Sequence, residues 1–216
     1  MAQANGREII GANAFATAAD FEQIFTQDMS GLYLLSFLLA GDPNKAEECF
    51  AAGIEESTKG KRVFKEWARS WARRSVIQSA IRVIEPREHS ERELRPHDVA
   101  RTIDKLPAAL QPEVSAIVEL APFERFVLVM SVLERYSDHD CSILLGCARR
   151  DVTAARDRAL RQLARSIGFP KNEAATGSEH SVVHEAPDPI ADLAIAQYFA
   201  TQRANRNLSQ VAPVWP

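Results

Sequence analysis

The sequence predicts an all-α protein, and three observations lead to this fold class. Apolar residues recur at helical spacing along most of the chain. No segment alternates apolar and polar residues between hairpin turns, as a half-buried strand would. The longest apolar run, residues 32–40, is far shorter than the roughly 20 residues of a membrane-spanning helix. The N-terminus lacks the sustained apolar stretch of a secretory signal, so we expect a cytoplasmic protein without membrane contact.

The first of two predicted domains spans residues 14–84. Gly41 is expected to end its second helix. Asp42 and Pro43 are typical of a helix start, because aspartate can cap free amide groups and proline is tolerated at the first helical position. Four helices are expected in this domain, over residues 15–25, 32–39, 43–57 and 63–84.

The segment after this domain, residues 85–111, is charged and interrupted by prolines. This composition predicts a flexible linker with at most one short helix near residues 99–106. At the other end of the chain, residues 169–216 begin with a stretch rich in Gly, Ser, Glu and Pro, which is typical of a disordered connector. One more short helix is expected within this C-terminal extension, over residues 190–202.

The second predicted domain spans residues 112–168, with helices beginning at its prolines. Ser137 stands where an N-cap should, with Asp140 as its capping partner. Gly146 is expected to end that short helix, and a final helix is expected over residues 149–167.

Residues 136–163 carry the strongest functional pattern. A short helix, a tight turn at Gly146 and a basic second helix predict a helix-turn-helix, whose second helix enters the major groove of DNA. Arginine suits guanine edges and phosphates, and threonine can bond to either. The residues expected to face outward are Arg149, Arg150, Thr153, Arg156 and Asp157. The alternative is an ordinary helical hairpin with a solvated basic face.

A second basic segment lies in the first domain, although the net charge of the chain is −3. Between residues 59 and 82 the cationic side chains are opposed by a single acid, Glu66. Trp67 and Trp71 lie one helical turn apart among these cations, and aromatic residues interleaved with Lys and Arg suit single-stranded nucleic acid. The cations expected to bind it are Arg69, Arg73 and Arg74. The alternative is that both Trp side chains are core and the arginines are solvated.

Residues 120–163 resemble region 4 of the sigma-70 family of RNA polymerase sigma factors, in particular the extracytoplasmic-function group. The matching steps are Glu124-Arg125, Tyr136-Ser137, Leu145-Gly146, Val152 and Arg158-Ala159. The resemblance implies that the segment from Arg149 to Arg158 reads the upstream promoter element, and that this domain contacts the polymerase flap.

Residues 34–81 are similar to region 2 of the same family. The resemblance implies that Ala46, Glu47 and Glu48 bind the clamp helices of core RNA polymerase. It also implies that residues 67–78, which include Gln78, hold the downstream element as the DNA melts. The chain would then be a sigma factor that directs promoter-specific initiation, with core polymerase and promoter DNA as partners. An anti-sigma protein is a further candidate partner.

Other classes of protein remain open at this point. The first alternative is a stand-alone helix-turn-helix regulator that binds duplex DNA without polymerase, and another is a helical adaptor that binds only protein. His180 and His184 have the i, i+4 spacing of a zinc site but lack an obvious third ligand. The cysteines form no CxxC pair and are expected to be core thiols. We therefore expect no catalysis, no cofactor and no metal.

Overall fold

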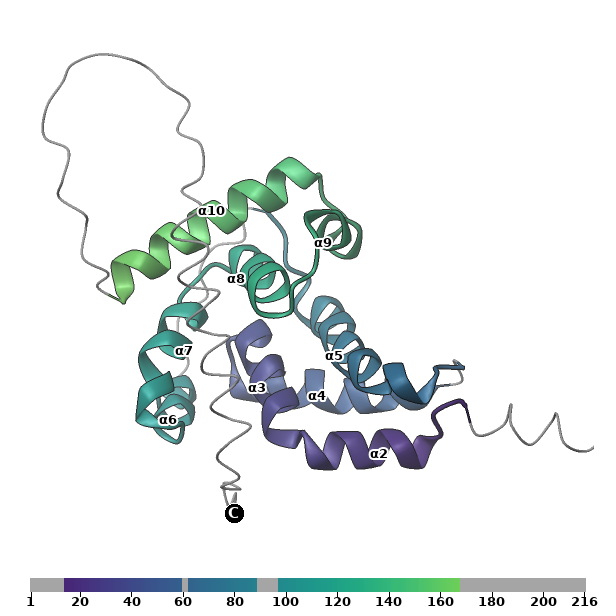
Figure 1. The fold of residues 1–216 in the computed structure, drawn as a ribbon. Coiled ribbons are helices and arrows are strands. Elements are labelled where there is room, and N and C mark those ends of the chain that lie inside the picture. The colour runs from purple at the N-terminus through teal and green to yellow at the C-terminus, as the bar shows by residue number, and fades with distance from the viewer. Residues whose placement is uncertain (1–13, 60–61, 89–96, 168–216) are drawn as a thin grey trace, which may run out of the picture.

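The computed structural model describes residues 14–59, 62–88 and 97–167 (Figure 1). Within these ranges the chain is mostly helical and forms no strand beyond one isolated β-bridge, which confirms the all-α prediction. None of the described helices is both long enough and apolar enough to cross a membrane. The predicted helix at 190–202 and the histidine pair at 180 and 184 lie outside the described residues.

The helices of the first half begin and end where local capping signals stand. Thr17 and Asp20 form a capping box at the start of α2, and Gly41 ends α3 in the left-handed conformation, with φ of 70°. The Asp42 carboxylate accepts a hydrogen bond from the Lys45 amide at 2.9 Å, and so caps α4 as expected. These helices are α2 (Ala18–Gln27), α3 (Met29–Ala40), α4 (Pro43–Thr58) and α5 (Ala68–Ile84).

The prediction of one continuous helix over residues 63–84 was wrong in its first turn. The Ala16 amide donates to the Val63 carbonyl at 2.7 Å, and the Lys65 amide donates to the Ala14 carbonyl at 2.9 Å. An isolated β-bridge joins Phe15 to Phe64, so the backbone here is extended. A short 3₁₀ turn, η1 (Lys65–Trp67), follows before α5 begins. Pairing with a distant segment has overridden the local preference for helix.

The second half contains shorter elements. The Ser137 hydroxyl accepts from the Asp140 amide at 3.1 Å, and Gly146 ends α9 with φ of 66°, so both predicted boundaries are confirmed. Part of the segment predicted as a linker forms α6, whose Val99 and Ile103 are buried. The elements are α6 (His97–Asp104), η2 (Ala108–Leu110), α7 (Gln111–Val118), α8 (Pro122–Leu128), the π-helical turn η3 (Val129–Leu133), α9 (Asp138–Leu145) and α10 (Arg149–Ser166).

The two predicted domains pack against each other in this structure and share one hydrophobic core. Helix α3 contacts α4 and α5 of the first half and also α7 and α8 of the second. Arg125 of α8 is 6% exposed, and its guanidinium donates to the carbonyls of Leu39 and Ala40 at the end of α3, at 3.1 and 2.9 Å. The same guanidinium donates to Val118 and Leu120 at 3.3 Å. Arg125 therefore satisfies backbone acceptors of both halves.

Candidate nucleic-acid interface

Helices α9 and α10 pack against each other across the turn at Gly146. Cys141 of α9 and Val152 and Ala155 of α10 are fully buried, as the sequence predicted for the contact between these helices. A Cβ atom added at Gly146 would meet nothing within 4 Å, so the left-handed backbone, rather than lack of space, favours glycine there. The first turn of α10 lies beside α9 (Figure 1), and its residues 149 and 150 are exposed.

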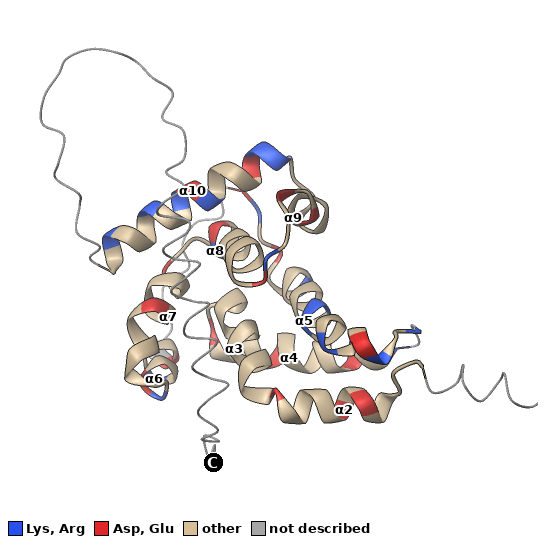
Figure 2. Cartoon of the chain, viewed as in Figure 1, with Lys and Arg blue, Asp and Glu red and all other residues tan. Residues whose placement is uncertain are grey.

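The predicted binding residues of α10 differ in how available they are. Arg149 and Arg150 in the first turn are exposed, and the Arg150 side chain, 88% exposed, lies 3.4 Å from the carboxylate of its neighbour Asp151. Lys and Arg also gather at this end of α10 in Figure 2. We name Arg149 and Arg150 the α10 surface.

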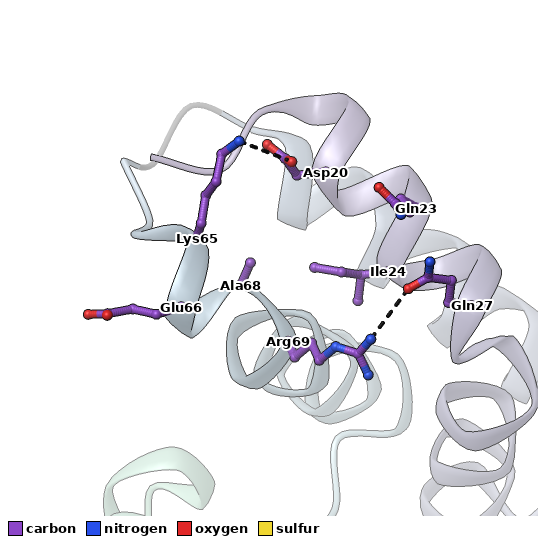
Figure 3. A pocket seen from close by; sticks show the side chains of 8 residues that line it. All are labelled: Asp20, Gln23, Ile24, Gln27, Lys65, Glu66, Ala68 and Arg69. Atoms are coloured by element: carbon purple, nitrogen blue, oxygen red, sulfur yellow. Dashed lines mark hydrogen bonds and ion pairs between the residues drawn. The ribbon is translucent and has the colours of Figure 1, made fainter. Parts of the chain in front are cut away.

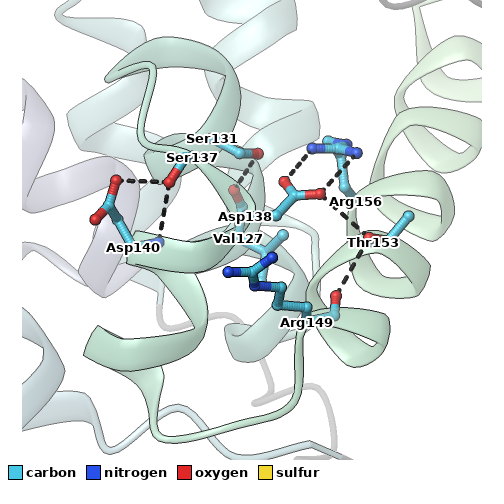
Figure 4. Close-up of polar contacts among 8 residues, drawn as sticks. All are labelled: Val127, Ser131, Ser137, Asp138, Asp140, Arg149, Thr153 and Arg156. Carbon is cyan, nitrogen blue, oxygen red and sulfur yellow. Dashed lines mark hydrogen bonds and ion pairs between the residues drawn. The ribbon is translucent and has the colours of Figure 1, made fainter.

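Further along α10, most of the predicted residues contact side chains of neighbouring helices. Arg156 donates to Asp138 of α9 at 2.5 Å, and the Thr153 hydroxyl donates to the same carboxylate at 3.2 Å (Figure 4). Arg158 donates to Glu124 of α8 at 2.7 Å, and Asp157 is half-buried. In this structure Thr153, Arg156 and Arg158 therefore hold α10 to α9 and α8, which sequence spacing alone did not indicate.

An aromatic cluster with two exposed rings and one half-buried ring lies beside α5. Trp67 is 59% exposed and meets Phe64 edge to face at 5.3 Å between ring centroids. Phe64 in turn stacks on Phe15 at 4.7 Å, and the Arg62 guanidinium lies 5.4 Å from the Phe15 ring centroid. Of these four residues only Trp67 was predicted as a binding residue. The basic neighbours of Phe64 were an available signal, whereas Phe15 joins the cluster only through the β-bridge.

A polar groove of about 340 Å³ adjoins this cluster, between α2 and the start of α5 (Figure 3). Arg69 crosses it to reach the Gln27 side chain at 3.3 Å, and Lys65 lies 3.4 Å from Asp20. The pKa of Asp20 is lowered, first by hydrogen bonds from Thr17 and to a lesser extent by Lys65. Arg69 is exposed although it bonds Gln27, and its contact with nucleic acid stays a prediction. We name the aromatic cluster, Lys65 and Arg69 the α5 surface.

The remaining predicted residues of α5 lie further along the helix and are less exposed. Trp71 is half-buried and packs against the core, so the two Trp side chains do not form one exposed face. Gln78 is also half-buried. Arg73 forms a bidentate ion pair with Glu134, which raises the pKa of Arg73. The charge of Arg74 lies near Tyr136, whose pKa is raised chiefly by burial.

The three residues predicted to bind polymerase separate into core and surface. Ala46 is fully buried, because this face of α4 packs on α5, and it offers no contact surface. Its inclusion among the binding residues was therefore wrong for this structure. Glu47 and Glu48 are exposed.

Comparison with protein-family models, with curated proteins and with solved structures finds no match for this chain. Among the described residues, no three His, Cys, Asp or Glu side chains gather as metal ligands would. In the part of the chain that the structure describes, the candidate site consists of two surfaces with basic side chains on an all-α fold. One of these surfaces, the α5 surface, also carries aromatic side chains.

The thiols differ in expected reactivity. Burial raises the pKa of Cys49 to about 11 and that of Cys141 to about 12, and it raises the pKa of the half-buried Cys147 as well. Because the thiolate is the nucleophile, iodoacetamide at pH 8 should modify Cys147 first and the other two only after unfolding. Intact-mass measurement over time, with a guanidinium-unfolded control, tests this order.

Rapid modification of Cys49 or Cys141 in the folded protein would contradict that prediction.

The same raised thiol pKa values predict how the stability of the fold depends on pH. The pKa of each thiol is higher in the folded protein than the usual value of 9.0. The contribution of each thiol to the free energy of unfolding is therefore complete below about pH 9. That contribution is lost as the pH rises through about 11 and 12.

Proposed function

We propose that the chain is a sigma factor, which binds core RNA polymerase and directs promoter-specific initiation of transcription. The observation that carries the proposal is the aromatic cluster of Phe15, Phe64 and Trp67 with Arg62 beside it, in which Phe64 and Trp67 are exposed. Exposed rings next to cations bind unstacked bases and their phosphates, which melted DNA presents together and duplex DNA does not. Lys65 and Arg69 lie on the same surface, together with the acids Asp20 and Glu66.

The α10 surface supplies the second part of the proposed function. Arg149 and Arg150 project from the first turn of a helix that follows a short helix and a left-handed glycine turn. This order of elements is how many proteins present a helix to the major groove, where arginine recognises guanine or a phosphate. A promoter-selecting protein needs both a duplex-reading surface and a surface for the melted strand.

Polymerase binding is proposed for Glu47 and Glu48, the exposed acidic pair on α4. Replacing both with lysine should weaken binding to core polymerase by about tenfold, because two attractive charge contacts would become repulsive. Biolayer interferometry with immobilised core enzyme measures this change. The control is Glu22→Lys with Asp104→Lys, which makes the same charge change at exposed positions on α2 and α6. Equal affinity of wild type and the Glu47/Glu48 variant would remove the acidic pair from the interface.

In vitro transcription tests the proposed function as a whole. Purified core polymerase, the full chain and a sheared genomic library are incubated, and the transcript starts are sequenced. The proposal expects discrete starts that share two spaced upstream sequence boxes. DNA binding without any initiation would instead support the stand-alone regulator.

The regulator is the second candidate, favoured by the exposed first turn of α10 alone. It needs no surface for single strands and leaves the aromatic cluster without a role. Binding to duplex DNA, with no binding to single-stranded DNA even when core polymerase is present, would favour it over the sigma factor. Failure to bind either form would favour a protein adaptor.

A further inference from the structure

Two of the side chains predicted to hold melted DNA contact another part of the chain. Arg73 of α5 donates from Nε to Oε2 of Glu134 at 2.7 Å, and its Nη2 donates to the other carboxylate oxygen. Arg74, the next residue, lies near Tyr136, where its positive charge opposes the rise that burial causes in the pKa of Tyr136. Glu134 and Tyr136 lie in the turn between η3 and α9. This turn therefore covers α5 where the sequence predicted a DNA contact.

The geometry of the contact is that of phosphate recognition. A planar guanidinium binds a carboxylate or a phosphate through the same two parallel hydrogen bonds. Asp28, between α2 and α3, approaches Arg73 Nη1 at 3.6 Å, so Arg73 lies between two carboxylates. The Arg73 side chain is 25% exposed and that of Glu134 is 9% exposed, so the surrounding protein partly shields the pair from solvent.

The backbone of the turn is adapted to this contact. Arg135, between the two contacting residues, has φ of 59°, a left-handed conformation that costs a non-glycine residue free energy. The Glu134 amide donates to the Val129 carbonyl and the Tyr136 amide to the Met130 carbonyl, and these bonds anchor the turn to the first residues of η3. The turn therefore directs both flanking side chains toward α5.

We propose that the turn of residues 134–136 is an intramolecular inhibitor of DNA binding at α5, an inference that rests on the function proposed above. Glu134 occupies the two hydrogen-bond donors of Arg73 that a phosphate of the melted strand would need. A phosphate can bind Arg73 in this way only if Glu134 leaves. If it stayed, its carboxylate would repel the incoming strand. The isolated chain is thus closed toward melted DNA until the turn moves away from α5.

Single-stranded DNA binding by the full chain without polymerase tests the inhibition. The probe is a fluorescein-labelled oligodeoxynucleotide of mixed sequence, and anisotropy gives the dissociation constant at low salt. Glu134→Gln should bind about fivefold more tightly than wild type, because the open state is then more populated. Glu22→Gln is the matched control, since it removes an equal charge from an exposed position on α2. It should bind as wild type does.

A double-mutant cycle shows whether Glu134 acts through Arg73. If it does, Glu134→Gln should give no gain in affinity when Arg73 is already glutamine. Glu134→Asp withdraws the carboxylate by one methylene and should give a smaller gain. Circular dichroism establishes that each variant is folded. If one of the two variants at position 134 is unfolded, the DNA affinity of the other variant tests the inhibition.

The outcomes separate the inhibition from the proposed function. Equal affinity of wild type and both position-134 variants would overturn the inhibition, while transcription initiated by all of them would leave the sigma factor proposal standing. Tighter binding by Glu134→Gln, with no initiation by any variant, would support the contact but overturn the sigma factor. No DNA binding by any variant would overturn the inhibition, and transcription would then decide the function separately.

Discussion

Replacing Arg125 with methionine should lower the free energy of unfolding by about 3 kcal/mol, the largest effect that we expect from a single substitution. The buried guanidinium donates to four backbone carbonyls, two of them at the end of α3 and two just before α8. Methionine fills similar space but donates no hydrogen bond. The four carbonyls, which lie at the contact between the two halves, would therefore lose the hydrogen bonds from Arg125. Urea denaturation followed by circular dichroism measures the change.

Arg161→Met is the matched control for this experiment, because Arg161 is exposed on α10. Its effect should stay within about 0.5 kcal/mol. Equal stability of the Arg125 and Arg161 variants would show that Arg125 does not hold the two halves together in solution.

Reversing the charge of the α10 surface should reduce affinity for duplex DNA by about 100-fold. In the variant with Arg149→Glu and Arg150→Glu, two carboxylates would face the phosphates that the arginines attract. Both side chains are exposed, so their replacement removes no core contact and the fold should persist. An electrophoretic mobility shift assay with pooled genomic duplexes measures the loss.

The control reverses two other exposed arginines of the same helix, Arg161 and Arg165. They lie toward the far end of α10, away from its first turn, so this variant should lose much less affinity. An equal loss in both variants would indicate attraction to the helix as a whole. Unchanged binding by the Arg149/Arg150 variant would exclude the first turn as the reading surface.

Features fixed by neighbouring residues could be predicted from the sequence. Asp42, Ser137 and Gly146 act on backbone groups within one helical turn, so their residue types suffice to place the helix boundaries. The all-α class follows from apolar spacing for the same reason. Burial within the α9 and α10 contact was also predictable, since Cys141 and Val152 lie on the inner faces of consecutive helices.

Features that depend on distant residues could not be predicted. The extended backbone at Val63 requires Ala16, and the core position of Ala46 depends on how α4 packs against α5. The pairing of Arg73 with Glu134 likewise joins residues that are far apart in sequence. An arginine that reads as a solvated or DNA-binding residue in sequence can thus be one half of an internal ion pair.

The β-bridge between Phe15 and Phe64 means that the aromatic cluster comes from two separate stretches of the chain. A protein shortened to begin at Thr17 would keep every described helix but lose one ring and the two backbone hydrogen bonds that join residues 14 and 16 to residues 65 and 63. Such a shortened protein could retain the helical circular dichroism of the parent and yet present a different surface to a nucleic-acid strand. Helical content is thus a poor guide to whether the α5 surface is intact.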